Sequence, residues 1–296
     1  MKFGIMSMQA RDLLPKATTM DEAMQALSQF DLSPLVEKLH REGFDPIEIG
    51  GDLSLFFPQV FSASGIQRLA DLQSSDGTTY TVHLPLWSVE PSTPIEAIRE
   101  ASVGTVVSII QATLPLRPLR YVLHATGPLA AEFYEMPFPE DVRPLALRLF
   151  QQNARRSIAT ILEKTGIPSR LLAIETIEFP FELTLELAEQ MDLSMCLDTG
   201  HVLAGFSGPV DLFDALEQML PRLGEIHLHD SPWQGPEHVR QQGKDHSKLG
   251  TGDLNVGRLL DRLQGAGYDG PIVFELTLDE ARDSLTTVRS LRPGLA

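Results

Sequence analysis

Hydrophobic and polar positions follow two different periods along this chain. Short runs of consecutive apolar residues recur eight times and predict strands, whereas the longer stretches between them space apolar residues as a half-buried helix does. The predicted strands are Lys2–Ser7, Pro46–Gly50, Thr79–Leu84, Arg120–His124, Arg170–Thr176, Met195–Asp198, Gly224–His229 and Pro271–Leu276. The predicted helices are Leu32–Glu42, Pro94–Ala112, Val142–Lys164, Phe181–Gln190, Leu212–Leu220 and Val256–Ala266.

Eight strand–helix units in alternation predict an α/β fold, a single (β/α)8 TIM barrel over residues 1–296. Strands that are apolar throughout are typical of a parallel sheet covered on both faces. An open doubly wound sheet is the competing topology. It is disfavoured because the first strand is followed by Ser7-Met-Gln-Ala-Arg11 and not by a glycine-rich phosphate-binding turn.

The composition of the chain limits which binding partners and which cellular compartment we expect. The chain carries 40 acidic and 24 basic residues, a formal charge of −16, which disfavours general nucleic-acid binding. Its one cysteine, Cys196, rules out an intramolecular disulfide and fits a reducing compartment. The start of the chain is too short to form a signal-peptide core, and no apolar run approaches the roughly 20 residues that cross a bilayer. We therefore expect a cytoplasmic protein with no membrane partner.

Histidines and carboxylates gather at the ends of the predicted strands. Six of the eight histidines stand at or just beyond such ends, in the company of three carboxylates: His83, His124, Glu175, Asp198, His201, His227, His229, His246 and Glu275. A barrel brings the carboxyl ends of all its strands to one mouth. Any one of these acids could cap a helix or pair with a surface base. Several charged groups directly after apolar strands are harder to explain in that way, because a buried unpaired charge costs several kcal/mol. Imidazole and carboxylate are ligands for zinc and manganese, so the pattern predicts a divalent metal site.

The same stretches resemble a known family, the xylose-isomerase-like barrels, which include sugar isomerases, sugar epimerases and abasic-site endonucleases. The resemblance covers about six strands in the right order and rests on Ile174-Glu175, Cys196-Leu-Asp198-Thr-Gly-His201, Ile226-His227-Leu-His-Asp230, Leu249-Gly-Thr-Gly252 and Phe274-Glu275. In the isomerase and epimerase branch, the resemblance implies one metal held by Glu175, Asp198, His227 and Glu275.

The endonuclease branch implies more metal ions, with zinc as the favoured ion and manganese as the alternative. In that branch His83, His124 and Glu175 correspond to one site, and Glu175 bridges to the site of Asp198, His227 and Glu275. His201 and His246 would belong to a third. Two ions about 3.5–4 Å apart suit phosphate ester hydrolysis, because one activates water and the other stabilises the leaving oxygen.

One departure from the endonuclease pattern affects the third site. The pattern has an aspartate two residues before the last histidine, where this chain has Lys244, and Asp245 instead adjoins His246. The third site is therefore either absent or rebuilt with Asp245. His229 and Asp230 could also contribute, His229 only if its strand stays extended. His83 and His124 could instead touch substrate without holding an ion.

The predicted rim loops indicate the substrate class. They are poor in basic residues and rich in apolar ones, which disfavours DNA and favours a sizeable, partly apolar small molecule with a phosphate ester. The predicted walls include Phe56, Phe57, Leu86, Trp87, Phe206 and Trp233, and the bases best placed for a phosphate are Arg11, Lys244 and Lys248. We favour a metal-dependent phosphodiesterase acting on a nucleotide-like molecule. A resemblance to the cobamide-remodelling phosphodiesterases implies the nucleotide loop of a B12-type corrinoid as its substrate.

Two alternatives from other classes stay open. In a one-metal sugar (phosphate) isomerase or epimerase, Glu175 and Glu275 would form the acid–base pair and His201 would grip a hydroxyl. In a non-enzymatic binding protein, Glu175→Gln would leave function intact. The number of metal ions per chain separates the isomerase, with one, from the hydrolase, with two or more. The sequence leaves the oligomeric state open.

Overall fold

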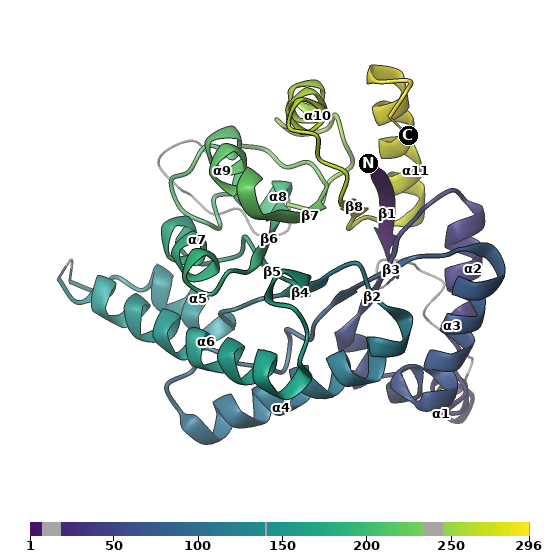
Figure 1. Ribbon diagram of the computed structural model, residues 1–296, viewed down its shortest axis with the longest axis horizontal. Coiled ribbons are helices and arrows are strands. Elements are labelled where there is room, and N and C mark those ends of the chain that lie inside the picture. The colour runs from purple at the N-terminus through teal and green to yellow at the C-terminus, as the bar shows by residue number, and fades with distance from the viewer. Residues whose placement is uncertain (8–18, 140, 234–244, 296) are drawn as a thin grey trace.

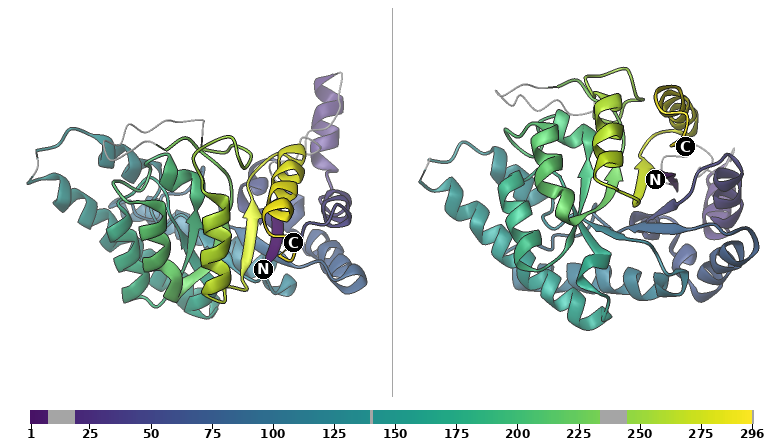
Figure 2. Two further views of the ribbon diagram at one scale, coloured as in Figure 1. Left: turned by 90° about the horizontal axis from the view of Figure 1, so that it is seen from above. Right: turned by 45° about the horizontal axis from the view of Figure 1, so that its top comes forward.

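The computed structural model describes residues 1–7, 19–139, 141–233 and 245–295. Its eight strands are all parallel and pair in chain order, with β8 closing onto β1, so that they form a closed barrel (Figure 1). Helices surround the barrel, as two further views show (Figure 2). The (β/α)8 barrel predicted from the sequence is confirmed.

All eight predicted strands are present, most of them one to three residues shorter than the apolar runs suggested. The shortening falls mainly at the carboxyl ends, where the chain leaves the sheet to form the mouth. The strands are β1 (Lys2–Met6), β2 (Ile47–Gly50), β3 (Tyr80–His83), β4 (Tyr121–Leu123), β5 (Leu172–Glu175), β6 (Ser194–Asp198), β7 (Leu223–His227) and β8 (Pro271–Phe274).

The six predicted helices are also present. They are α2 (Ser33–Arg41), α4 (Glu96–Thr113), α6 (Arg143–Thr165), α7 (Phe181–Gln190), α9 (Leu212–Met219) and α10 (Val256–Gly265). The apolar pattern did not predict α1 (Met20–Ser28), α3 (Ala63–Asp76), α5 (Pro128–Glu135), α8 (Thr199–Leu203) and α11 (Leu278–Leu291). The short helix α5 lies between β4 and α6, where the apolar pattern predicted no helix.

Strand alternation divides the barrel into an outer core and a polar interior. Side chains on the outward face, such as Ile49, Val82, Ile174 and Leu197, are fully buried in the main core between sheet and helices. Each such side chain stabilises the fold by roughly 1.5–3 kcal/mol. The side chains that alternate with them point into the barrel, and this is why buried polar residues collect there.

No helix of the described residues is both long enough and apolar enough to cross a membrane.

Candidate metal centre at the barrel mouth

The predicted ligands converge because each occupies an inward position at the end of its strand. Four of them are the last residue of their strand, and two follow directly after theirs. In chain order they are His83 on β3, His124 after β4, Glu175 on β5, Asp198 on β6, His227 on β7 and Glu275 after β8. Strand pairing sets Asp198 opposite His227, so that neighbouring strands present ligands at the same height.

Glu175 lies at the centre of the cluster, and each of its two carboxylate oxygens faces its own pair of histidines. Oε2 is 3.1 Å from His83 Nε2 and 2.9 Å from His124 Nε2. Oε1 is 3.3 Å from His201 Nδ1 and 3.3 Å from His227 Nδ1. Because Glu175 is only 1% exposed, these histidines replace water as its hydrogen-bonding environment.

His227 gives the clearest evidence that the cluster fits a cation. Its ring is fully buried, and neither nitrogen has a hydrogen-bond partner within the described chain. Nδ1 lies between three carboxylate oxygens, 3.3 Å from Glu175, 3.5 Å from Glu275 and 3.8 Å from Asp198. A divalent ion among these four atoms, which lie within 4.8 Å of one another, would satisfy all of them.

A third group forms around His201, Asp245 and His246. Asp198 accepts a hydrogen bond from the His201 backbone N–H at 2.7 Å as the N-cap of α8, which places the His201 ring at the mouth. Asp245 Oδ2 is 2.7 Å from His246 Nδ1 and 3.7 Å from His201 Nε2. Of the two alternatives that the sequence left open, the structure therefore has the cluster rebuilt with Asp245. Lys244, at the position of the expected aspartate, lies outside the described residues.

His229 also belongs to the site, although β7 ends two residues before it. Its Nε2 is 2.8 Å from Asp198 Oδ2, its ring stacks on His246 with centroids 4.2 Å apart, and its Nδ1 contacts the Asp245 carbonyl. A Cβ at Gly200 would collide with both the His229 ring and that carbonyl, so only glycine allows this close approach.

Asp230, which the sequence suggested as a further contributor, has its carboxylate bound by backbone groups. Its carboxylate is fully buried and accepts hydrogen bonds at 2.8–3.0 Å from the backbone N–H groups of Ser231, Gly250, Gly252 and Leu254. It therefore organises the Leu249–Gly252 turn that had suggested the family.

The charges of the site shift its pKa values strongly. Burial opposes protonation of His83, but the hydrogen bond and charge of Glu175 outweigh it and raise the pKa of His83 to about 9. Burial likewise opposes protonation of His201, and the charges of Asp198 and Glu175 raise its pKa to about 9. The pKa of Glu175 is held well below its usual value, because the neighbouring histidines, His124 first, outweigh the effect of burial.

A second layer of polar residues, which the sequence patterns did not predict, lies beneath the candidate metal centre. Glu48 on β2 is fully buried, lies with Oε1 3.4 Å from His227 Nε2, and accepts a hydrogen bond from Thr81 Oγ1 at 3.0 Å. Burial and the nearby Glu48 raise the pKa of Glu225 well above its usual value. In the strands of Glu48 and Glu225, a single acidic residue stands inside an apolar run, as in Ile47-Glu48-Ile49. This pattern was the signal that could have revealed the layer.

The central pocket, with a volume of about 250 Å³, opens directly onto these ligands. Its wall includes Met6, Asp52, Leu86 and Trp87. Buried Asp52 accepts hydrogen bonds from the backbone N–H groups of Leu86 at 2.9 Å and Trp87 at 3.3 Å, and so holds the loop after β3 over the site.

Only some of the predicted substrate-binding residues line the central pocket. Trp87 lines the central pocket, as expected. Phe57 was wrongly placed in the rim: it is 4% exposed and packs on Phe30 with ring centroids 4.1 Å apart, because the 3-10 turn η4 (Pro58–Phe61) directs it into the core. The ammonium of Lys248 pairs with Asp283 at 2.8 Å and Lys248 lines neither pocket described here, so its contact with substrate stays a prediction.

The remaining predicted substrate-binding residues are Phe56, Trp233, Arg11 and Lys244. Phe56 and Trp233 are more than half exposed and neither lines the central pocket, so their contact with substrate stays a prediction. Arg11 and Lys244 lie outside the described residues.

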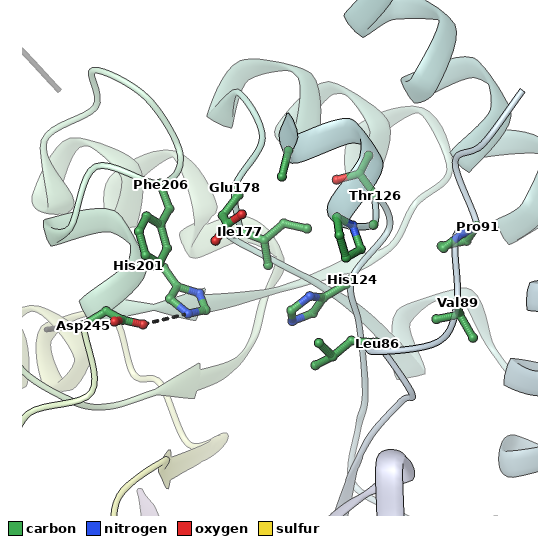
Figure 3. Close-up of a pocket in the computed structure, with 13 residues that line it drawn as sticks. Leu86, Val89, Pro91, His124, Thr126, Ile177, Glu178, His201, Phe206 and Asp245 are labelled. Carbon is green, nitrogen blue, oxygen red and sulfur yellow. Dashed lines mark ion pairs between the residues drawn. The ribbon is translucent and has the colours of Figure 1, made fainter. Parts of the chain in front are cut away.

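A side pocket of about 290 Å³ adjoins the central one and shares Leu86, His124 and His201 with it. In Figure 3, His124 and His201 approach each other from opposite walls of the side pocket, and Ile177 lies between them.

Several known proteins are similar to this chain in sequence or in structure. The protein MJ1311 of Methanocaldococcus jannaschii, whose name assigns no activity, is 24% identical over 254 residues, which is 82% of this chain and 78% of that protein. A D-tagatose 3-epimerase-like protein has a similar structure, with a TM-score of 0.69 and 20% identity over 98% of this chain and 97% of that one. Endonuclease IV from Thermus thermophilus gives a TM-score of 0.64 and 18% identity over 98% of both chains.

The two structural likenesses show the fold alone, since both are below 25% identity. The sequence model of one family, however, matches residues 36–292, nearly the whole barrel. The chain therefore belongs to the xylose isomerase-like TIM barrel family.

Proposed function

We propose that the protein is a metal-dependent phosphodiesterase acting on a small molecule. The observation that carries this proposal is the position of Glu175, whose two oxygens face separate pairs of histidines. A carboxylate placed in this way suits a bridge between two cations. In a site for one cation, His83 and His124, at 3.1 and 2.9 Å from the far oxygen, would instead have to contact the substrate.

In this proposal the ligands divide into sets that share residues. His83, His124 and Glu175 hold one ion, Glu175, Asp198, His227 and Glu275 hold a second, and His201, Asp245 and His246 form the third group. Zinc is the ion that these ligands suit best, with manganese as the alternative. Bound ions of this kind act as Lewis acids and lower the pKa of water.

The side chains of the site have their own roles in the proposed reaction. His201 lines both pockets, so we assign it to orient the phosphodiester between them. Glu275 Oε2 lies 3.2 Å from His246 Nε2, and both side chains line the central pocket. Where the third group holds no ion, this pair can exchange a proton with a water or an alcohol held there.

The charge of the central pocket supports an anionic substrate only when cations are bound. Among the described residues that line it there is no lysine or arginine, whereas Asp52, Glu175 and Glu275 are acidic. A phosphodiester would be repelled unless bound cations outweighed these carboxylates. The formal charge of −16 further favours a small substrate over duplex DNA.

The second candidate is a sugar epimerase with a single metal ion. Glu175, Asp198, His227 and Glu275 form a complete four-ligand set by themselves, and the fold resembles that of a D-tagatose 3-epimerase-like protein. In that reaction Glu175 and Glu275 would move a proton next to a carbonyl.

Elemental analysis together with an activity screen tests the proposal. We expect two or more ions per chain and cleavage of phosphodiesters, with abasic-site DNA, adenosylated corrinoids and ketoses assayed in parallel. One ion per chain with conversion of a ketose would establish the epimerase instead. The corrinoid arm tests the narrower proposal that the substrate is the nucleotide loop of a cobamide. If Glu175→Gln left function intact, a non-enzymatic binding role would replace both.

A further inference from the structure

The side pocket differs in chemistry from the central pocket that it adjoins. Its walls are mainly apolar and include Leu86, Val89, Pro91, Ala131, Ile177 and Phe206. Its polar side chains, other than the two shared histidines, are Thr126, Glu178 and Asp245, and no lysine or arginine of the described residues lines it. A sugar or a second phosphate would leave many of its polar groups without partners here, at a cost of roughly 1–3 kcal/mol each.

The walls of the side pocket are fixed by buried contacts behind them. The Ser157 hydroxyl donates to the Pro91 carbonyl at 2.6 Å, which ties the loop after β3 to α6. Glu90 accepts from the Leu129 N–H at 2.9 Å, which ties the same loop to α5. Ile177 packs in a small core cluster with Phe150 and Phe179. The pocket is therefore formed before any ligand arrives, as is usual for small-molecule sites.

The position and size of the pocket limit what it can hold. Because His124 and His201 line both pockets, a group bound in the side pocket lies directly beside the proposed reaction centre (Figure 3). Its volume of about 290 Å³ is roughly twice that of an apolar cavity of about 150 Å³ that holds benzene. The Phe206 ring, 5.2 Å from the His201 ring between centroids, offers an aromatic surface at this junction.

We propose that the side pocket binds an uncharged, flat apolar group about the size of two fused aromatic rings. This group is carried by one of the two alcohols esterified to the phosphate. The inference rests on the proposed phosphodiesterase function and adds to it the class of substrate: an aryl-bearing diester, in preference to a purely aliphatic or sugar diester.

A series of 4-nitrophenyl phosphodiesters tests this inference with metal-loaded protein. The second alcohol is methyl, phenyl or 2-naphthyl, so the leaving group stays the same throughout. We expect kcat/KM to rise by about tenfold or more from methyl to 2-naphthyl, mainly through a lower KM, because the naphthyl group is buried in the side pocket. Equal values across the series would overturn the proposal.

A variant pair locates the effect. Ala131→Leu places a larger side chain in the side pocket and should bring the naphthyl-to-methyl ratio of kcat/KM close to one. Ala101→Leu makes the same change at an exposed position of α4 that lines neither pocket, and should keep the ratio of the unmodified protein. A ratio that survives Ala131→Leu in a folded protein with full metal content would place the binding group elsewhere.

The two proposals fail in distinguishable ways. If no ester of the series is cleaved by protein containing two ions per chain, the phosphodiesterase function fails. Calorimetric titration with 2-naphthyl phosphate and methyl phosphate then tests the side pocket alone. Tighter binding of the naphthyl compound that is lost in Ala131→Leu supports the pocket, and equal binding overturns it.

Discussion

Removing the metal ions should give this protein an unusual dependence of stability on pH. In the metal-free protein, protonated His83 and His201 neutralise the charge of Glu175, whereas a bound metal requires its histidine ligands to be neutral. Chelator treatment followed by unfolding at several pH values therefore reports directly on the arrangement around Glu175.

The magnitude follows from His83. Its pKa rises from 6.5 to about 9 in the folded protein, and this difference corresponds to about 3 kcal/mol of stabilisation. Because the folded pKa is the higher one, this stabilisation is fully present below pH 6.5 and is lost as the pH rises through about 9. His201, with a pKa also raised to about 9, shares the same carboxylate, so we expect the two contributions to overlap and not to add.

The interaction that raises the pKa values of the histidines also lowers the pKa of Glu175. Its contribution is present above the ordinary value of 4.5 and is lost as the pH falls. The metal-free protein should therefore be most stable between about pH 4.5 and 6.5, the window bounded by the two ordinary pKa values.

Urea denaturation of EDTA-dialysed protein at pH 6 and pH 9 measures the effect. We expect the free energy of unfolding of the metal-free protein to fall by about 3 kcal/mol over this range. Zinc-loaded protein should not show this fall, because its histidines are already neutral. The Glu175→Gln variant should also lack it. A metal-free protein equally stable at both pH values, or a parallel loss in the zinc-loaded form, would refute the reasoning.

Three further predictions concern single residues. His83→Ala should remove one ion per chain and reduce diester cleavage by about 100-fold or more while the circular dichroism spectrum is unchanged; full metal content would show that His83 is not a ligand. Glu48→Gln should weaken zinc binding by about 10–100-fold in chelator competition, through the loss of its contact with His227, whereas Glu163→Gln on the exposed face of α6 should have no effect. Asp230→Ala should destabilise the zinc-loaded protein by about 3 kcal/mol or more, because four backbone N–H groups lose a buried carboxylate; a loss below about 1 kcal/mol in urea would contradict this.

Much of the barrel could be read from local patterns. Buried parallel strands are apolar along their length, and a run such as Leu171–Ile174 followed directly by Glu175 marks both the strand and its open end. The six ligands at strand ends were found in this way, and the fold brings all of them to one mouth. The helices α3 and α11 were missed, although both pack against the barrel through several buried residues.

The finer parts of the site depend on contacts between residues distant in sequence. The sequence left open whether Asp245 joins His246, and nothing local places Glu48 beneath His227. Phe57 looked like a rim residue in an apolar loop, and only the 3-10 turn that follows it directs the ring into the core. The side pocket is built from five separate segments of chain, so no single segment carries its pattern.

The sequence alone determined the barrel and the histidines and carboxylates at its strand ends, because strand alternation and the burial of apolar side chains act over a few neighbouring residues. The tertiary structure decided which oxygen faces which imidazole, which acids lie beneath the metal centre, and where an apolar group can enter. Those features depend on distances across the barrel of a few ångströms, which are set jointly by all eight strands and by the loops above them.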